Sequence, residues 1–385
     1  MLKQKLNLFS HVLRFVAGMK WGPTEGSLLR LYQSLFVGYI RYSLPILSNL
    51  NISCLRTLES VQVQALKICL GLPRRASDNG IIEEAHVCPL SVYLCHEPLR
   101  VYLRLLTRHY GHPLTSVLHE RPDSIFTSAL RRHLPHITLG SALLYHPVKP
   151  LWVMVQPSVC VHVPGILKKS LVPVSGLQQL ALTYIWSEYQ SLVHVYTDGS
   201  TSPKESTAAV VIPAQQMTRG FILHHNSTST AAELVAIGEP IRHICGERPQ
   251  EWCIFTDSKH ALQILGCFLR HTAYQVLALQ ITELLSCAQE KHHRIVFQWI
   301  LGHCGLNGNE MAYAEARRAL SNGLRTVVPF SRPYITCLLS ELMRSAMRRY
   351  WAKPDARHVR LKRLDPDMQF PVLRGIPRPH TCLIH

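Results

Sequence analysis

The sequence lacks the features of a secreted or membrane-spanning protein. No run reaches the roughly 18 consecutive apolar residues expected of a transmembrane helix, and the nearest candidate, 34–50, is interrupted by Arg41 and Pro45. The N-terminal residues have no compact apolar core followed by a small-residue cleavage site, so we expect no signal peptide. We therefore expect an intracellular protein, nuclear or cytoplasmic, that is not secreted and has no membrane partner.

Cysteines and charged residues are also few. There are 12 Cys in 385 residues and no Cys-x-x-Cys pair, which excludes a small disulfide-bonded scaffold and favours reduced thiols. Charged residues make up 17% of the chain and hydrophobic residues 47%, a balance that excludes an intrinsically disordered protein. The length is sufficient for roughly two or three domains with buried cores.

Acidic residues are scarce, with 24 Asp and Glu against 41 Lys and Arg, a formal net charge of +17. Such an excess favours a polyanionic partner, which is nucleic acid or an acidic membrane surface. The segment 193–320 is nevertheless close to neutral, with 10 basic and 11 acidic residues. The basic charge therefore lies in the flanks. If the neutral central segment binds a polyanion, either its carboxylates have a specific task or its affinity comes from the basic flanks.

The hydrophobic pattern divides the chain into four parts. Residues 1–110 repeat apolar side chains at three- and four-residue spacing, which predicts a mostly helical region. Residues 111–189 are rich in Pro and His and read as a connecting region, with a short helix over 177–189. Residues 190–322 form an α/β segment, and 323–385 form a basic C-terminal extension.

Within the α/β segment, two alternating patterns, two β-rich runs and one short apolar run predict five strands. The stretches between and after them predict four helices. The expected strands are 193–198, 207–212, 220–224, 252–256 and 294–300. The expected helices are 230–245, 258–269, 273–290 and 309–320. Pro240 lies inside the first of these helices and is expected to kink or end it near Glu239.

Three carboxylates occupy special places in this pattern. Asp198 follows a strand, Glu233 lies in the first turn of a helix, and Asp257 stands between a strand and the next helix. Taken singly, each is more often a turn former or a helix cap than a catalytic group. If they converge, they need a cation between them, and oxygen ligands suit Mg²⁺. Two such ions about 3.5–4 Å apart can hold the attacking water and the leaving oxygen of a phosphodiester.

A glycine-rich run follows the last strand and carries His303. A histidine near a metal centre can relay protons, although a histidine in such a loop is by itself more often structural.

Together these segments resemble type 1 ribonuclease H. The matching residues, in the order of that family, are Tyr196-Thr197-Asp198-Gly199-Ser200, Ala232-Glu233-Leu234, Phe255-Thr256-Asp257-Ser258, Trp299-Ile300-Leu301-Gly302-His303 and Asn309-Glu310. The resemblance covers about 130 residues, roughly 190–322, and the order of strands and helices agrees with it.

The resemblance implies a ribonuclease H-like mixed five-stranded sheet with flanking helices. It also implies Mg²⁺-dependent hydrolysis of the RNA strand of RNA–DNA hybrids, with two ions and with Mn²⁺ able to replace them. Asp198, Glu233 and Asp257 become catalytic metal ligands, and His303 becomes the catalytic loop histidine. Substrate contacts are implied for Ser200, Ser258 and Asn309. The implied partner is an RNA–DNA hybrid and not a small molecule.

One residue departs from the family pattern. The fourth carboxylate of the family falls on Tyr313, whose phenol, with a pKa of about 10, is a poor Mg²⁺ ligand. Glu310 is the glutamate normally present beside that carboxylate, and Glu315 should face another side of the helix. We therefore expect weaker binding of one ion and a reduced rate. A catalytically impaired module that still binds hybrid, and a remnant that binds only proteins, remain alternatives.

The N-terminal region supports a looser resemblance. Residues 24–90, with the run Ala65 to Arg74, resemble the segment after the reverse transcriptase in non-LTR (LINE-like) retrotransposon polyproteins. The paired aspartates of the polymerase are absent, since no Asp-Asp occurs in the chain. The resemblance implies a C-terminal fragment of such an element.

Overall fold

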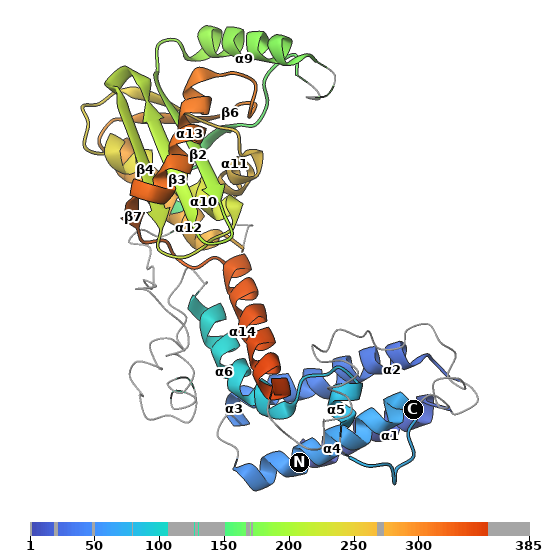
Figure 1. Cartoon of the computed structure of the whole chain (residues 1–385). Coiled ribbons are helices and arrows are strands. Elements are labelled where there is room, and N and C mark those ends of the chain that lie inside the picture. The colour runs from blue at the N-terminus through green and yellow to red at the C-terminus, as the bar shows by residue number, and fades with distance from the viewer. Residues whose placement is uncertain are drawn as a thin grey trace. The chain divides into compact units, whose positions relative to one another are not determined.

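A computed structural model describes residues 2–18, 22–47, 51–78, 80–106, 127, 130, 151–166, 170, 172–267 and 273–352. The basic tail after residue 352 and most of the connecting region lie outside these residues. The chain divides into two compact units (Figure 1). Unit 1 comprises residues 1–102, 117–138 and 338–385, and unit 2 comprises 103–116 and 139–337. Among the described residues, no helix combines the length and the apolar character that crossing a bilayer would require.

Unit 2 is built on a seven-stranded mixed sheet. From edge to edge the strands are β1 (Ser158–Cys160), β6 (Arg294–Trp299), β5 (Glu251–Thr256), β2 (Val193–Thr201), β3 (Ser206–Ile212), β4 (Met217–Leu223) and β7 (Leu324–Thr326). The antiparallel pairs are β2–β3 and β3–β4, and the other pairs are parallel. The five central strands confirm the predicted strands, and the two edge strands, three residues each, were not anticipated.

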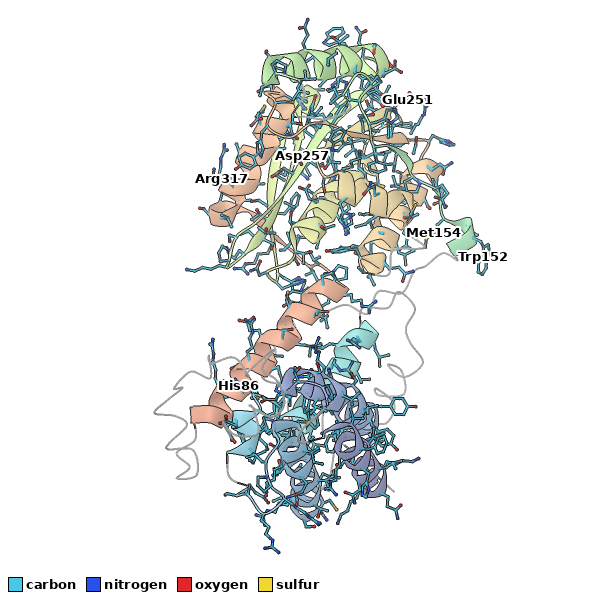
Figure 2. The ribbon with its side chains drawn as sticks, turned by 90° about the vertical axis from the view of Figure 1, so that its right-hand side faces the viewer. His86, Trp152, Met154, Glu251, Asp257 and Arg317 are labelled. Atoms are coloured by element: carbon cyan, nitrogen blue, oxygen red, sulfur yellow. The ribbon has the colours of Figure 1, made fainter. Side chains whose placement is uncertain are left out.

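Helices cover both faces of this sheet. They are α9 (Val174–Tyr189), α10 (Ser229–Ile244), α11 (Lys259–Gly266), α12 (Gln275–Glu290) and α13 (Asn307–Asn322). The main apolar core lies between the strands and α10, α11 and α12. A second cluster joins α9 to β5 and to the loop after β6. Figure 1 shows α13 lying across the strands β2, β3 and β4, and Figure 2 shows Glu251 and Asp257 at the two ends of β5.

Pro240 was expected to kink or end its helix near Glu239, and the expectation of an end was wrong. Helix α10 runs through Pro240 to Ile244. Proline removes one helical hydrogen bond, but Ile241 and Ile244 beyond it are fully buried in the main core. Their burial outweighs the lost bond and keeps the last turn helical.

The N-terminal part of unit 1 is helical, as predicted. It contains α1 (Leu2–Val16), α2 (Glu25–Tyr32), a π-helical turn (Gln33–Val37), α3 (Gly38–Leu47), α4 (Ile52–Leu70), α5 (Ile81–Glu84) and α6 (Leu90–Leu106). Helix α14 (Arg332–Ala352) contributes its residues from 338 onward. Asn51 caps α4 by accepting from the Cys54 amide, and Gly71 ends it in the left-handed conformation (φ 78°).

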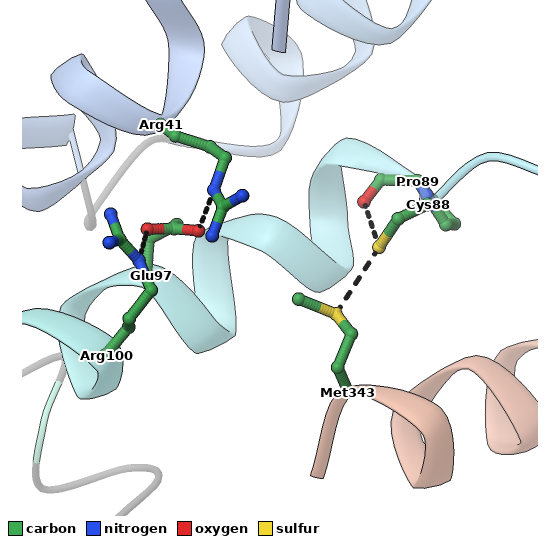
Figure 3. Close-up of polar contacts among 6 residues, drawn as sticks. All are labelled: Arg41, Cys88, Pro89, Glu97, Arg100 and Met343. Atoms are coloured by element: carbon green, nitrogen blue, oxygen red, sulfur yellow. Dashed lines mark hydrogen bonds and ion pairs between the residues drawn. The ribbon is translucent and has the colours of Figure 1, made fainter. Parts of the chain in front are cut away.

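Two polar contacts fix α6 in unit 1 (Figure 3). Glu97 is 1% exposed and accepts from the Nε atoms of both Arg41 and Arg100. The Cys88 thiol donates to the Pro89 carbonyl and to the Met343 sulfur, each at 3.6 Å. A buried carboxylate is tolerated only when it is paired, so the two arginines make the burial of Glu97 possible.

Candidate metal centre

Two of the predicted carboxylates reach the site from neighbouring parallel strands. In the register of β2 and β5, Thr197 lies opposite Thr256, so Asp198 and Asp257 follow at the same level. Side chains of adjacent parallel strands at the same level lie close together. The Thr197 hydroxyl donates to the Phe255 carbonyl at 3.3 Å, which ties the two strands together just before the aspartates.

The third carboxylate comes from α10. Thr228 caps this helix by accepting from the Ala231 amide at 3.3 Å, and Glu233 follows within the first turns. The helix can approach β2 closely because residue 199 is glycine: a Cβ atom there would lie 2.3 Å from the Glu233 amide nitrogen. The glycine next to Asp198 therefore allows Glu233 to reach the same point as the two aspartates.

The structure brings Asp198, Glu233 and Asp257 together, as the sequence predicted. One ligand oxygen from each lies within 4.8 Å of the others, and no second group of this kind exists among the residues that the structure describes. Asp198 is 6% exposed and Glu233 7%. Asp198 Oδ2 and Glu233 Oε2 are buried without a hydrogen-bond partner. Buried carboxylate oxygens without donors are suited to a hard divalent cation, so this donor set fits Mg²⁺ or Mn²⁺.

The ionisation of the cluster reflects its burial. Burial and the neighbouring Asp257 and Glu310 raise the pKa of Asp198 to about 6, and His303 acts in the opposite direction. Burial also raises the pKa of Glu233 well above its usual range, with Asp198 and Asp257 adding to the effect. A cation bound between these groups would favour their charged forms.

The loop after β6 approaches the cluster from another side. A Cβ atom on Gly302 would lie 2.3 Å from Asp257 Oδ2, so only glycine fits there without displacing the carboxylate. Leu301 and Cys304 anchor the loop in the apolar cluster under α9, while His303 between them is exposed. His303 has a φ of 55°, in the left-handed region.

Helix α13 carries the residues around the departure from the family pattern. The rings of Tyr313 and His303 are 5.1 Å apart and perpendicular, at 88°. Glu310, one turn earlier, lies near enough to affect Asp198, a role that its position in the sequence did not reveal. Glu315 faces β4, where its Oε1 would be 3.0 Å from a Cβ on Gly220. This confirms the expectation that Glu315 faces away from Tyr313.

The three residues expected to contact substrate lie in different environments. Ser200 is half-buried on β2, and its carbonyl accepts from the Thr207 hydroxyl at 3.5 Å. Ser258 caps α11 by accepting from the Ala261 amide at 3.4 Å. Asn309 is 2% exposed, and its Oδ1 is buried without a hydrogen-bond partner.

Part of the chain is similar to known proteins. Residues 190–321 match the family model described as RNase H. No curated protein matches the sequence. Among solved structures, RNase H1 from the halophilic archaeon Halobacterium salinarum NRC-1 is similar at 17% identity, over 34% of this chain and 98% of that chain, with a TM-score of 0.27. The family match therefore covers the segment 190–321, about a third of the chain.

Proposed function

We propose that the RNase H domain hydrolyses the RNA strand of RNA–DNA hybrids, using divalent cations held by Asp198, Glu233 and Asp257. The observation that carries the proposal is the convergence of these three carboxylates, with two buried oxygens that have no hydrogen-bond partner. The match of residues 190–321 to the RNase H family model supports the same reaction.

Each part of the site has a distinct task in this proposal. Mg²⁺, when bound, would supply an activated water and neutralise charge on the phosphodiester. Asp198, Glu233 and Asp257 hold the cations, and the close approach of Gly302 keeps Asp257 directed at the site. His303 stands at the exposed rim, where an imidazole can accept or deliver a proton. Ser200 and Ser258, half-buried beside the aspartates, are the proposed contacts to the nucleic-acid backbone.

The proposal is tested by cleavage of an RNA–DNA hybrid in Mg²⁺ or Mn²⁺ by the full chain. We expect cutting of the RNA strand only, and its loss in Asp198→Asn. Glu251→Gln is a matched control, because Glu251 lies at the opposite end of β5 from Asp257 and pairs with Arg294 on the surface. If Asp198→Asn cuts at the rate of the unmodified protein, the assignment of the metal centre is wrong.

A second function is favoured by Tyr313, which replaces a fourth acidic ligand. We propose as the alternative a catalytically impaired module that binds hybrid without turning it over. It predicts salt-dependent hybrid binding and no cleavage by the unmodified chain in either metal. Tyr313→Asp would then restore cutting, whereas cleavage by the unmodified chain rules this alternative out.

We also propose that the chain is the C-terminal part of a non-LTR retrotransposon polyprotein. This rests on the likeness of residues 24–90 to the segment after a reverse transcriptase. Sequencing the DNA upstream of the coding region tests it. We expect a reading frame, intact or interrupted, that encodes a polymerase with paired aspartates, and an unrelated upstream sequence would contradict the proposal.

A further inference from the structure

Tyr313 stands where the family pattern places an acidic ligand, and it makes a contact that a carboxylate could not make. Its ring lies edge-to-face with the imidazole of His303, with centroids 5.1 Å apart. On the same helix, the guanidinium of Arg317 lies 5.8 Å from the centre of the Tyr313 ring, and Figure 2 marks Arg317 on α13. Tyr313 is therefore an aromatic neighbour of both a loop histidine and a helix arginine.

The loop that carries His303 has a fixed backbone. Leu301 and Cys304 are buried on either side of it. From α9, the Gln178 side-chain amide donates to the Gly305 carbonyl at 2.7 Å. These contacts hold the main chain of the loop, but they do not restrict rotation of the exposed His303 side chain about its own bonds.

The ring of Tyr313 supplies that restriction. An exposed side chain samples several staggered rotamers unless a neighbour favours one. A perpendicular aromatic pair at this separation is favourable enough to bias the rotamers by roughly two- to tenfold. The contact uses the ring and not the hydroxyl, so phenylalanine would serve equally and aspartate would not serve at all.

We propose that Tyr313 is a positioning residue that holds the imidazole of His303 beside the Asp198, Glu233 and Asp257 cluster. The inference deepens the function proposed above and rests on it. Instead of a metal ligand, position 313 here supplies a ring that restricts the rotamers of the His303 side chain. Aspartate at this position would add a carboxylate and remove the ring, so the two effects can be separated by substitution.

The test combines a spectroscopic measurement with a kinetic one on the full chain. With ¹³C-labelled histidine, the His303 resonance is assigned by its loss in His303→Gln. We expect a ring-current shift that Tyr313→Phe retains and Tyr313→Ala removes. Cleavage of hybrid should change in the same variants: Tyr313→Phe should keep the kcat of the unmodified chain, and Tyr313→Ala should lower kcat and leave KM unchanged. Arg318→Ala is the control, because Arg318 is on the same helix and pairs with Glu315, whereas Arg317 is the arginine near the Tyr313 ring.

The two measurements separate failure of the inference from failure of the proposed function. A His303 shift unchanged in Tyr313→Ala overturns the positioning role, as does a lost shift with unchanged kcat. A Tyr313→Phe variant as impaired as Tyr313→Ala shows that the hydroxyl matters and also overturns it. If the unmodified chain cuts no hybrid, the proposed function fails, and the positioning role in catalysis fails with it. The His303 ring-current shift in the Tyr313 variants then still shows whether the Tyr313 ring holds the imidazole.

Discussion

The pKa of Asp198 reports the effects of burial and charge repulsion in the site. Its pKa is raised to about 6 in the folded protein, mainly by burial, against about 3.9 for an unfolded chain. Between these values the folded state binds a proton that the unfolded state has lost. Without metal, the stability that this group contributes is therefore present below about pH 4 and is lost as pH rises through about 6.

This predicts a pH-dependent effect of Asp198→Asn. In EDTA, we expect the free energy of unfolding of the unmodified protein to fall by about 2 kcal/mol from this group alone between pH 4 and pH 7. Asp198→Asn should lack that fall and be the more stable protein at neutral pH. Urea unfolding at several pH values measures it. A parallel pH dependence in the two proteins would show that Asp198 ionises freely in the folded state.

Gly302 sets the position of Asp257 by its lack of a side chain. Because a Cβ there would lie 2.3 Å from Asp257 Oδ2, Gly302→Ala should push the carboxylate away and weaken Mg²⁺ binding by tenfold or more, about 1.4 kcal/mol or more. Isothermal titration measures the affinity. Gly266→Ala is the control, since a Cβ at Gly266 meets no atom within 4 Å. Equal affinities in the two variants would contradict the close approach.

At the scale of elements, Glu97 joins α6 to α3 through its contact with Arg41, and Arg100 on α6 adds a second ion pair to the same carboxylate. Glu97→Gln removes the charge and keeps the volume, and we expect it to destabilise unit 1 by about 1–3 kcal/mol. Chemical denaturation followed by circular dichroism measures the change. Glu341→Gln, on the exposed side of α14, should change stability by less than about 0.5 kcal/mol. A similar value for both would show that Glu97 contributes no net stability.

The sequence predicted the elements that have a clear period and missed those that are too short to show one. The five central strands have six or more residues each, long enough for an alternating, β-rich or apolar run to show. Strands β1 and β7 have three each and are defined only by their partners. The three carboxylates could be placed approximately, because each is near a strand end or a helix start in the predicted pattern. In the structure, however, Asp198 lies within β2 and Glu233 lies just beyond the first turn of α10. The contact of Tyr313 with His303 could not be predicted, because it depends on how the loop after β6 folds against α13.

For the whole molecule, metal binding and folding are coupled. A cation that binds the folded cluster, and not the unfolded chain, stabilises the protein by about 2.7 kcal/mol at a hundred times its Kd. We therefore expect a higher Tm in Mg²⁺ for the unmodified protein and no such increase for Asp198→Asn. Scanning calorimetry in Mg²⁺ and in EDTA measures this. An equal increase in both proteins would place the binding site elsewhere.

The sheet of unit 2 extends beyond the residues that match the RNase H family model. Strand β1, at 158–160, pairs with the outer side of β6, and α9 covers the apolar cluster beside it. A fragment cut at residue 190 would leave β6 as a bare edge, whose open amides and carbonyls can recruit another chain. Light scattering should then find residues 190–322 self-associating where 151–337 stays monomeric. The roughly 30 residues that precede residue 190, which contain β1 and α9, would thus protect the domain from aggregation.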